Sequence, residues 1–117
     1  MDAKLASILV LEDEWLIAED VARILRRLGY QVIGPALDPG TAEGLLATHH
    51  PNAALLDILV GQKTCYPLAD ILAKRGIPFA FATAFGATDL PERFAGCPLV
   101  TKPFGEARLR ATIRSLF

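Results

Sequence analysis

Apolar residues in this chain are concentrated in four short runs, and each run ends at a polar residue. The runs cover residues 8–11, 53–56, 79–82 and 99–100. Continuous apolar runs of this length are typical of strands that are buried on both faces, as in a parallel sheet covered by helices. A further strand is predicted at residues 30–33. The pattern therefore supplies the strands of one buried sheet.

Helical spacing of apolar residues appears between the predicted strands. The first helix has an apolar stripe made of Ile17, Val21, Ile24, Leu25 and Leu28. Asp38 followed by Pro39 predicts the start of a second helix that runs to about Thr48, because aspartate caps helices and proline suits their first position. A third helix is predicted to begin near Pro67. The last helix carries its stripe on Leu109, Ile113 and Leu116.

One connection, residues 84–98, is poorly suited to regular structure. Between Gly86 and Pro98, only Leu90 and Phe94 are larger apolar residues. A fourth helix around these two residues is therefore predicted to be weak. The alternation of strands and helices along the rest of the chain predicts an α/β fold with a parallel sheet.

Composition narrows the class of protein. A chain of 117 residues with 52% apolar and 21% charged residues suits one globular domain and excludes a disordered chain. The net charge of −1 lacks the excess of positive charge that nucleic-acid-binding proteins use to contact phosphates, so binding to nucleic acid is not expected. No apolar run approaches the roughly 18 residues of a membrane helix, and the N-terminus lacks a signal-peptide core. The two cysteines have no CxxC spacing and are expected to be reduced thiols. Together with the lack of a membrane helix and of a signal peptide in the sequence, this predicts a cytoplasmic protein that does not bind a membrane.

The polar residues that end the apolar runs form a chemically coherent set. Glu12 and Asp13 follow the first run, Asp57 follows the second, and Thr83 and Lys102 follow the last two. Carboxyl ends of parallel strands meet at one edge of the sheet, where ligands bind. Three converging carboxylates need a cation, and oxygen-only ligands favour Mg²⁺. A hydroxyl and an ammonium would hold phosphoryl oxygens, which predicts phosphoryl transfer to Asp57 and an aspartyl phosphate product.

Simpler interpretations exist for each of these residues taken alone. Asp13 could cap the first helix, and Asp57 could fix a turn at the end of a strand. Thr83 could be a turn hydroxyl and Lys102 a solvated side chain. Their joint placement at strand ends favours a site over these separate interpretations.

This order of residues resembles the receiver domain of two-component response regulators over essentially the whole chain. Residues 77–83, Ile-Pro-Phe-Ala-Phe-Ala-Thr, are similar to the signature of the FATGUY subgroup of single-domain receivers, and residues 57–61 and 66–69 also resemble that subgroup. The resemblance implies a doubly wound five-stranded parallel sheet in the flavodoxin-like order 2-1-3-4-5, with helices on both faces. It also implies one receiver domain over residues 1–117 without an output domain.

Carried over residue by residue, the resemblance implies a phosphoacceptor and a metal site. The phosphoacceptor is Asp57, which also binds the metal. Asp13 is implied as a direct ligand of Mg²⁺ and Glu12 as a ligand through water. Leu59, two residues after the phosphoacceptor, would give its backbone carbonyl to the metal.

The resemblance also implies a switch, with departures from the family pattern. Thr83 is the implied switch hydroxyl, and Lys102, followed by the usual cis peptide, pairs with the phosphoryl group. Most receivers place an aromatic residue two positions before the lysine, where this chain has Val100, and FATGUY members commonly have glycine where Ala84 stands. We therefore expect the signal to leave through residues 84–98, as an order–disorder change of a segment with few apolar anchors.

The expected function is that of a single-domain response regulator in a phosphorelay. It would accept a phosphoryl group on Asp57 from a sensor histidine kinase, possibly of the HWE type, or from a phosphotransfer protein. It would act through contacts with a downstream protein or as a phosphate sink, and would promote only its own phosphorylation and dephosphorylation. The alternative function is that of a phosphorylation-independent scaffold. A third possible function is that of a small phosphohydrolase, but such an enzyme would need a second carboxylate where this chain has Leu59.

Overall fold

The computed structural model describes residues 6–84 and 90–117. Its main sheet has five parallel strands in the order β2-β1-β3-β6-β7. The strands are β1 (Ser7–Leu11), β2 (Gln31–Ala36), β3 (Ala53–Asp57), β6 (Phe79–Thr83) and β7 (Leu99–Thr101). Because β6 and β7 are the fourth and fifth strands of this sheet along the chain, the predicted order 2-1-3-4-5 is confirmed.

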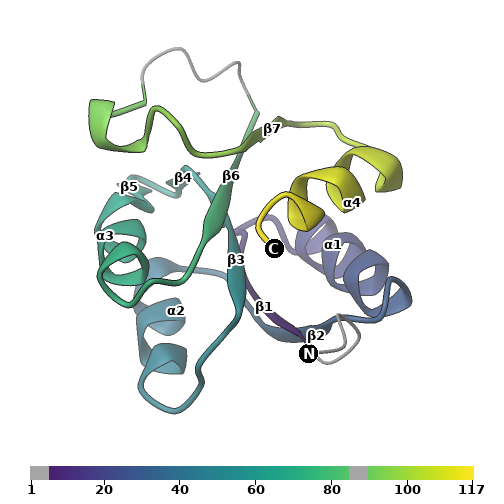
Figure 1. Cartoon of the computed structure of the whole chain (residues 1–117), viewed down its shortest axis with the longest axis horizontal. Helices are drawn as coiled ribbons and strands as arrows, with labels where there is room; N and C mark the ends of the chain where they lie inside the picture. The colour runs from purple at the N-terminus through teal and green to yellow at the C-terminus, as the bar shows by residue number, and fades with distance from the viewer. Residues whose placement is uncertain (1–5, 85–89) are drawn as a thin grey trace.

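Helices cover both faces of the sheet (Figure 1). One face carries α1 and α4, and the other carries α2 and α3. The helices are α1 (Trp15–Arg27), α2 (Pro39–Leu46), α3 (Tyr66–Lys74) and α4 (Glu106–Arg114). Asp38 caps α2 as predicted, since its carboxylate accepts a hydrogen bond from the Thr41 N–H at 2.8 Å. The α2 helix is two residues shorter than predicted. In the described part of the chain, no helix is long and apolar enough to cross a membrane.

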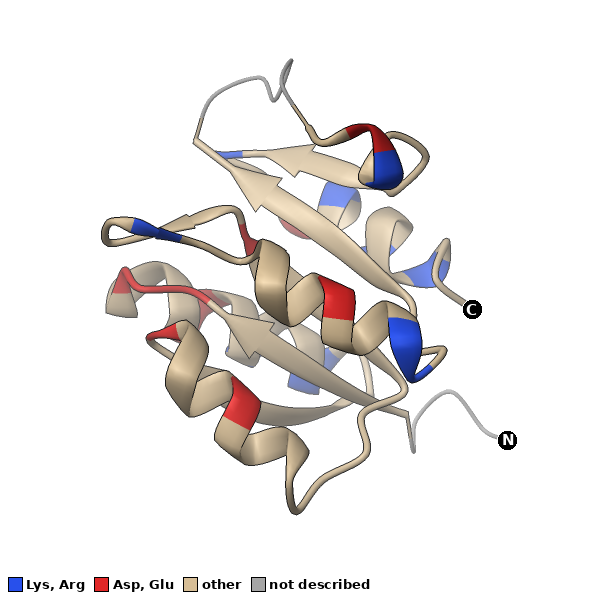
Figure 2. Ribbon diagram, turned by 90° about the vertical axis from the view of Figure 1, so that its left-hand side faces the viewer, with Lys and Arg blue, Asp and Glu red and all other residues tan. Residues whose placement is uncertain are grey.

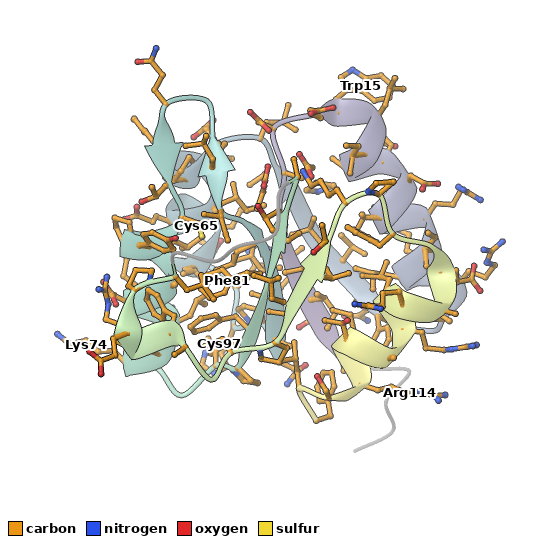
Figure 3. The ribbon with its side chains drawn as sticks, turned by 90° about the horizontal axis from the view of Figure 1, so that it is seen from above. Trp15, Cys65, Lys74, Phe81, Cys97 and Arg114 are labelled. Atoms are coloured by element: carbon orange, nitrogen blue, oxygen red, sulfur yellow. The ribbon has the colours of Figure 1, made fainter. Side chains whose placement is uncertain are left out.

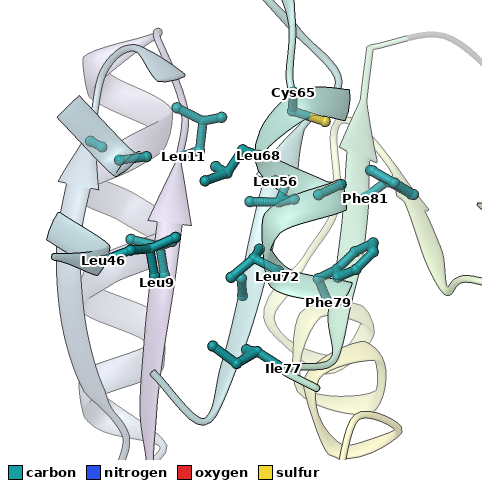
Figure 4. Packing of buried hydrophobic residues seen from close by; sticks show 14 of the residues in the cluster. Leu9, Leu11, Leu46, Leu56, Cys65, Leu68, Leu72, Ile77, Phe79 and Phe81 are labelled. Carbon is teal, nitrogen blue, oxygen red and sulfur yellow. The ribbon is translucent and has the colours of Figure 1, made fainter. Parts of the chain in front are cut away.

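The apolar runs are continuous because each strand contributes to two cores. In β1, Leu9 and Leu11 pack toward α2 and α3, whereas Ile8 and Val10 pack toward α1 and α4. Figure 4 shows the first of these cores, in which Phe81 is fully buried. Strands buried on both faces have no polar side to present to water, so their sequences do not alternate.

A small hairpin follows β3 directly and was not predicted from the sequence. Its strands, β4 (Leu59–Val60) and β5 (Lys63–Thr64), are antiparallel. They are joined by a two-residue turn, and the first residue of this turn is Gly61, with φ of 62°. In Figure 1 the hairpin lies beside the carboxyl ends of the central strands.

The predicted weak helix is a single 3-10 turn, η2 (Glu92–Phe94). Phe94 is 3% exposed, and its ring centroid lies 5.4 Å from that of Phe81 and 5.8 Å from that of Phe79. Tyr66 of α3 joins this group at 5.6 Å. Residues 84–98 were expected to have too few apolar anchors to dock a stable helix; from residue 90 onward Phe94 is one such anchor, and the helix is limited to one 3-10 turn. Residues 85–89, which also belong to that expectation, lie outside the described residues.

Candidate functional site

Three carboxylates converge at the carboxyl ends of the two central strands. Strand β1 runs into Glu12 and Asp13, and Asp57 is the last residue of its neighbour β3. Leu11 is paired with Leu56, so both strands end at the same height. One carboxylate oxygen from each of the three acids lies within 4.8 Å of the others. Figure 2 shows acidic segments gathered at this edge of the sheet.

Lys102 brings a positive charge to the two buried acids. It follows β7, and its N–H donates to the carbonyl of Thr83 at 2.7 Å, which ties it to the end of β6. Its Nζ lies 2.5 Å from Glu12 Oε1 and 3.3 Å from Asp57 Oδ2. The three side chains are 11%, 5% and 8% exposed, in the order Lys102, Glu12, Asp57. The charges are therefore shielded from water and interact strongly.

The pKa of Asp57 is raised to about 7, first because burial disfavours the charged carboxylate and second because Glu12 repels it. Lys102 opposes this shift without cancelling it. For Lys102, burial alone lowers the pKa, but the hydrogen bond to Glu12 and the charge of Asp57 outweigh burial and raise it. The lysine therefore stays an ammonium, while the neighbouring aspartate titrates near neutral pH.

Glu12 and Asp13 are held in different ways. Both oxygens of Glu12 have partners, because Oε1 pairs with Lys102 and Oε2 accepts from the Glu14 N–H at 3.0 Å. Asp13 is exposed, and its Oδ2 accepts a hydrogen bond from the Gly61 N–H at 3.0 Å. The interpretation of Asp13 as a helix cap is wrong, since the N-cap of α1 is Glu14 and makes no side-chain capping bond.

The remaining predicted residues lie around this centre. Thr83 is the half-buried last residue of β6. Leu59 opens the hairpin two residues after Asp57, with an exposed side chain. The peptide bond between Lys102 and Pro103 is cis, as the resemblance implied.

Val100, which stands where the resemblance places an aromatic switch residue, lies on the opposite face of the sheet from Phe94. It is buried in the core shared with α1 and α4, whereas Leu99 packs in the core that contains Phe94. Neighbouring residues of a strand point to opposite faces, so only one of the two can face Phe94. Both side chains are aliphatic, so β7 presents no aromatic ring to Phe94.

Gly61 is the residue of this site that the sequence reasoning missed. Glycine at the first position of a two-residue turn, between residues of strand propensity, is a known hairpin signal. It was available in the order Val60, Gly61, Gln62 and Lys63. The acidic cluster itself is compatible with a site for a divalent cation, because it offers only hard oxygen ligands.

Comparisons with known proteins agree with this fold. The chain is 32% identical to SdrG from Sphingomonas melonis Fr1, with a TM-score of 0.84 and 97% of both chains covered. It is 32% identical to the response regulator PhyR from Brucella abortus, with a TM-score of 0.80 over 96% of this chain and 47% of that one. It is 37% identical to the transcriptional regulatory protein PdtaR of Mycobacterium tuberculosis over 87 residues, or 74% of this chain. No family model matches the chain.

These relatives support a phosphoacceptor regulator fold for this chain, whose sheet carries an acidic cluster and a buried lysine at its carboxyl edge. The similarity to SdrG extends over nearly the full length of both chains. This chain belongs to the response regulator receiver domains. It spans 42% of the length of PdtaR, so the activities of the longer relatives are not carried over with the fold.

Proposed function

We propose that this receiver domain accepts a phosphoryl group on Asp57 in a phosphorelay. The observation that supports this role most directly is the position of Asp57 at the end of β3, buried and 3.3 Å from the ammonium of Lys102. A carboxylate oxygen of Asp57 would attack phosphorus as the bond from phosphorus to the donor nitrogen breaks. The electron pair leaves with that nitrogen, which takes a proton from solvent, and an acyl phosphate remains on Asp57.

The donor set suits Mg²⁺, because three carboxylates with oxygens within 4.8 Å of one another are only partly balanced by the one ammonium of Lys102. Asp13 and Asp57 would hold the ion directly, Glu12 through water, and Leu59 through its backbone carbonyl. When bound, Mg²⁺ supplies the positive charge that keeps Asp57 ionised and screens it from the incoming phosphoryl group. Glu12 is suited to bind the ion through water rather than directly, since both of its carboxylate oxygens already have partners in the protein.

Lys102 and Thr83 would stabilise the charge that moves onto the phosphoryl oxygens. Lys102 is held next to Asp57 before any phosphoryl group arrives, so little reorganisation is needed. Because its pKa is raised, mainly through the bond to Glu12 and the charge of Asp57, which outweigh burial, it remains charged at neutral pH. The hydroxyl of Thr83 would bind another oxygen of the same group.

A sensor histidine kinase or a phosphotransfer protein is the proposed donor, and the resemblance to FATGUY members favours a kinase of the HWE type. An open groove of about 690 Å³ lies beside Lys102. Its apolar lining comes from the first turns of α1 and from the segment after β7, and includes Leu16, Ile17, Pro103 and Phe104. Such a groove gives a protein donor an apolar surface to contact next to the acceptor.

The test is to incubate the protein with a small phosphodonor such as acetyl phosphate and Mg²⁺ and to measure its intact mass. We expect one phosphoryl adduct on the wild type and none on Asp57→Asn, whose amide is not a nucleophile. Asp20→Asn, which removes an exposed carboxylate paired with Arg23, is the matched control and should keep the adduct. An adduct on Asp57→Asn would move the acceptor elsewhere. No adduct on any variant would favour the scaffold, and continuous phosphate release would favour the phosphohydrolase.

A further inference from the structure

The hairpin that follows Asp57 is bonded to one of the acids of the site. The N–H of Gly61, at its tip, donates to Asp13 Oδ2 at 3.0 Å and joins residues that are 48 positions apart in the sequence. The same hairpin begins with Leu59, whose backbone carbonyl is the proposed metal ligand. The hairpin therefore contacts one group that would hold Mg²⁺, the carboxylate of Asp13, and supplies another, the backbone carbonyl of Leu59.

The base of the hairpin is fixed in the fold. Val60 is 4% exposed and packs in the core with α2 and α3. The Cys65 N–H donates to the carbonyl of Ile58 at 2.9 Å, and the Ile58 N–H donates to that of Ala82 at 3.0 Å. These contacts hold the tip of the hairpin at a defined position above the sheet edge. In Figure 3 the hairpin lies at the same edge as Trp15, the first residue of α1.

The bond has a chemical consequence for Asp13. An exposed aspartate on a loop samples several side-chain orientations, whereas a carboxylate held by a hydrogen bond presents its other oxygen in a defined direction. With Oδ2 occupied by the Gly61 N–H, Asp13 is suited to bind a cation through one oxygen. Mg²⁺ takes such single-oxygen ligands in a strict octahedron, whereas Ca²⁺ takes more ligands and often binds both oxygens of a carboxylate.

We propose that Gly61 is a positioning residue that orients Asp13 as a single-oxygen ligand, so that the hairpin tip sets both the affinity for Mg²⁺ and the preference for Mg²⁺ over Ca²⁺. This inference rests on the proposed function of Asp13 as a metal ligand. Because the donor is a backbone N–H, the bond depends on the left-handed conformation of Gly61, with φ of 62°.

The chain offers a matched control for a substitution at Gly61. Gly76, at the end of α3, also has a left-handed conformation, with φ of 71°. An added Cβ would meet nothing within 4 Å at either glycine, so alanine is strained at both positions by conformation alone. Gly61→Ala shifts the tip that bonds Asp13, whereas Gly76→Ala introduces the same kind of strain away from the acids. Gly61→Asn is the conservative variant, because asparagine tolerates the left-handed region.

The experiment is a titration of each protein with Mg²⁺ and separately with Ca²⁺, followed by calorimetry and by the fluorescence of Trp15, the one tryptophan of the sequence. We expect Gly61→Ala to bind Mg²⁺ about tenfold more weakly, as is typical when a group that orients a metal ligand is lost. Its ratio of Mg²⁺ to Ca²⁺ affinity should fall. Gly76→Ala should lose similar stability with both affinities unchanged, and Gly61→Asn should bind Mg²⁺ more like the wild type.

The outcomes separate this inference from the proposed function. If the wild type binds neither cation, the metal site itself is wrong and the role of Gly61 falls with it. If the wild type binds Mg²⁺ and Gly61→Ala binds it equally well, or no more weakly than Gly76→Ala, only the role of Gly61 is overturned. A tenfold loss with an unchanged ratio of the two cations would overturn the single-oxygen assignment of Asp13.

Discussion

Replacing Asp57 with asparagine should stabilise the metal-free protein at pH 8. In the wild type, the ionised carboxylate is buried beside Glu12, which repels it. Asparagine keeps the size of the side chain and removes that charge. Lys102 keeps a partner after the substitution, because its Nζ is 2.5 Å from Glu12 Oε1. The variant therefore loses a repulsion without leaving a buried charge unpaired.

The magnitude follows from the pKa of Asp57, which burial and then Glu12 raise from 3.8 to about 7. The folded state thus binds this proton more tightly than the unfolded chain does. The stability that results is fully present below pH 3.8 and is lost as the pH rises through about 7. One pKa unit corresponds to about 1.4 kcal/mol, so between pH 5 and pH 8 the wild type should lose about 3 kcal/mol at this site. The variant has nothing to titrate there.

The assay is urea unfolding of both proteins in EDTA at pH 5 and pH 8, followed by circular dichroism. The gain in unfolding free energy from Asp57→Asn should be about 3 kcal/mol larger at pH 8 than at pH 5, which corresponds to roughly 10 °C in Tm for a domain of this size. Asp20→Asn, which removes an exposed carboxylate, controls for general charge effects. Equal gains at the two pH values, or a less stable variant at pH 8, would refute the reasoning.

Three further predictions concern the same region. Mg²⁺ at ten times its Kd should raise the unfolding free energy by about 1.4 kcal/mol. The affinity of the protein for Mg²⁺ should rise with pH through about 7, because the bound metal displaces the proton of Asp57. Asp13→Asn should weaken the stabilisation by Mg²⁺. A flat Tm across millimolar Mg²⁺ would contradict the site. Lys102→Ala should cost roughly 3 kcal/mol at pH 8 and less at pH 5, where Asp57 is protonated, and should slow adduct formation in the mass assay. Phe94→Ala should cost about 3–5 kcal/mol in urea unfolding and increase hydrogen exchange over residues 90–98; unchanged exchange there would contradict an anchoring role.

The sequence was sufficient for the features that depend on burial along a strand. Strands β1, β3 and β6 are buried on both faces, so their apolar runs identify them without any tertiary information. The end of strand β2 was harder to predict. The predicted strand stops at residue 33, before Pro35, whereas the observed strand continues through Pro35 to Ala36. As an edge strand it has one side without a neighbour in the sheet, and proline is tolerated there.

The convergence of the acids was also accessible from sequence, since polar residues at the ends of neighbouring parallel strands meet by geometry. The bond between Asp13 and Gly61 was not accessible in this way. It depends on how the hairpin packs through Val60, a tertiary contact that no local pattern encodes. Which residues of β7 point to which face of the sheet could not be predicted from the sequence either, for a different reason. Three residues are too few for alternation to show whether Leu99 or Val100 faces Phe94.

The position of Phe94 changes how the segment after Thr83 should respond to the site. Phe81 lies two residues before Thr83 on β6, so both side chains leave the strand on the same face. The ring of Phe81 contacts that of Phe94, and Arg93 is bonded to Asp70 of α3 through two hydrogen bonds of 2.9 and 3.1 Å. Because the buried ring of Phe94 packs this segment against Phe81, we do not expect phosphorylation of Asp57 to order residues 90–98. Residues 90–98 should therefore respond as a packed unit that shifts with β6.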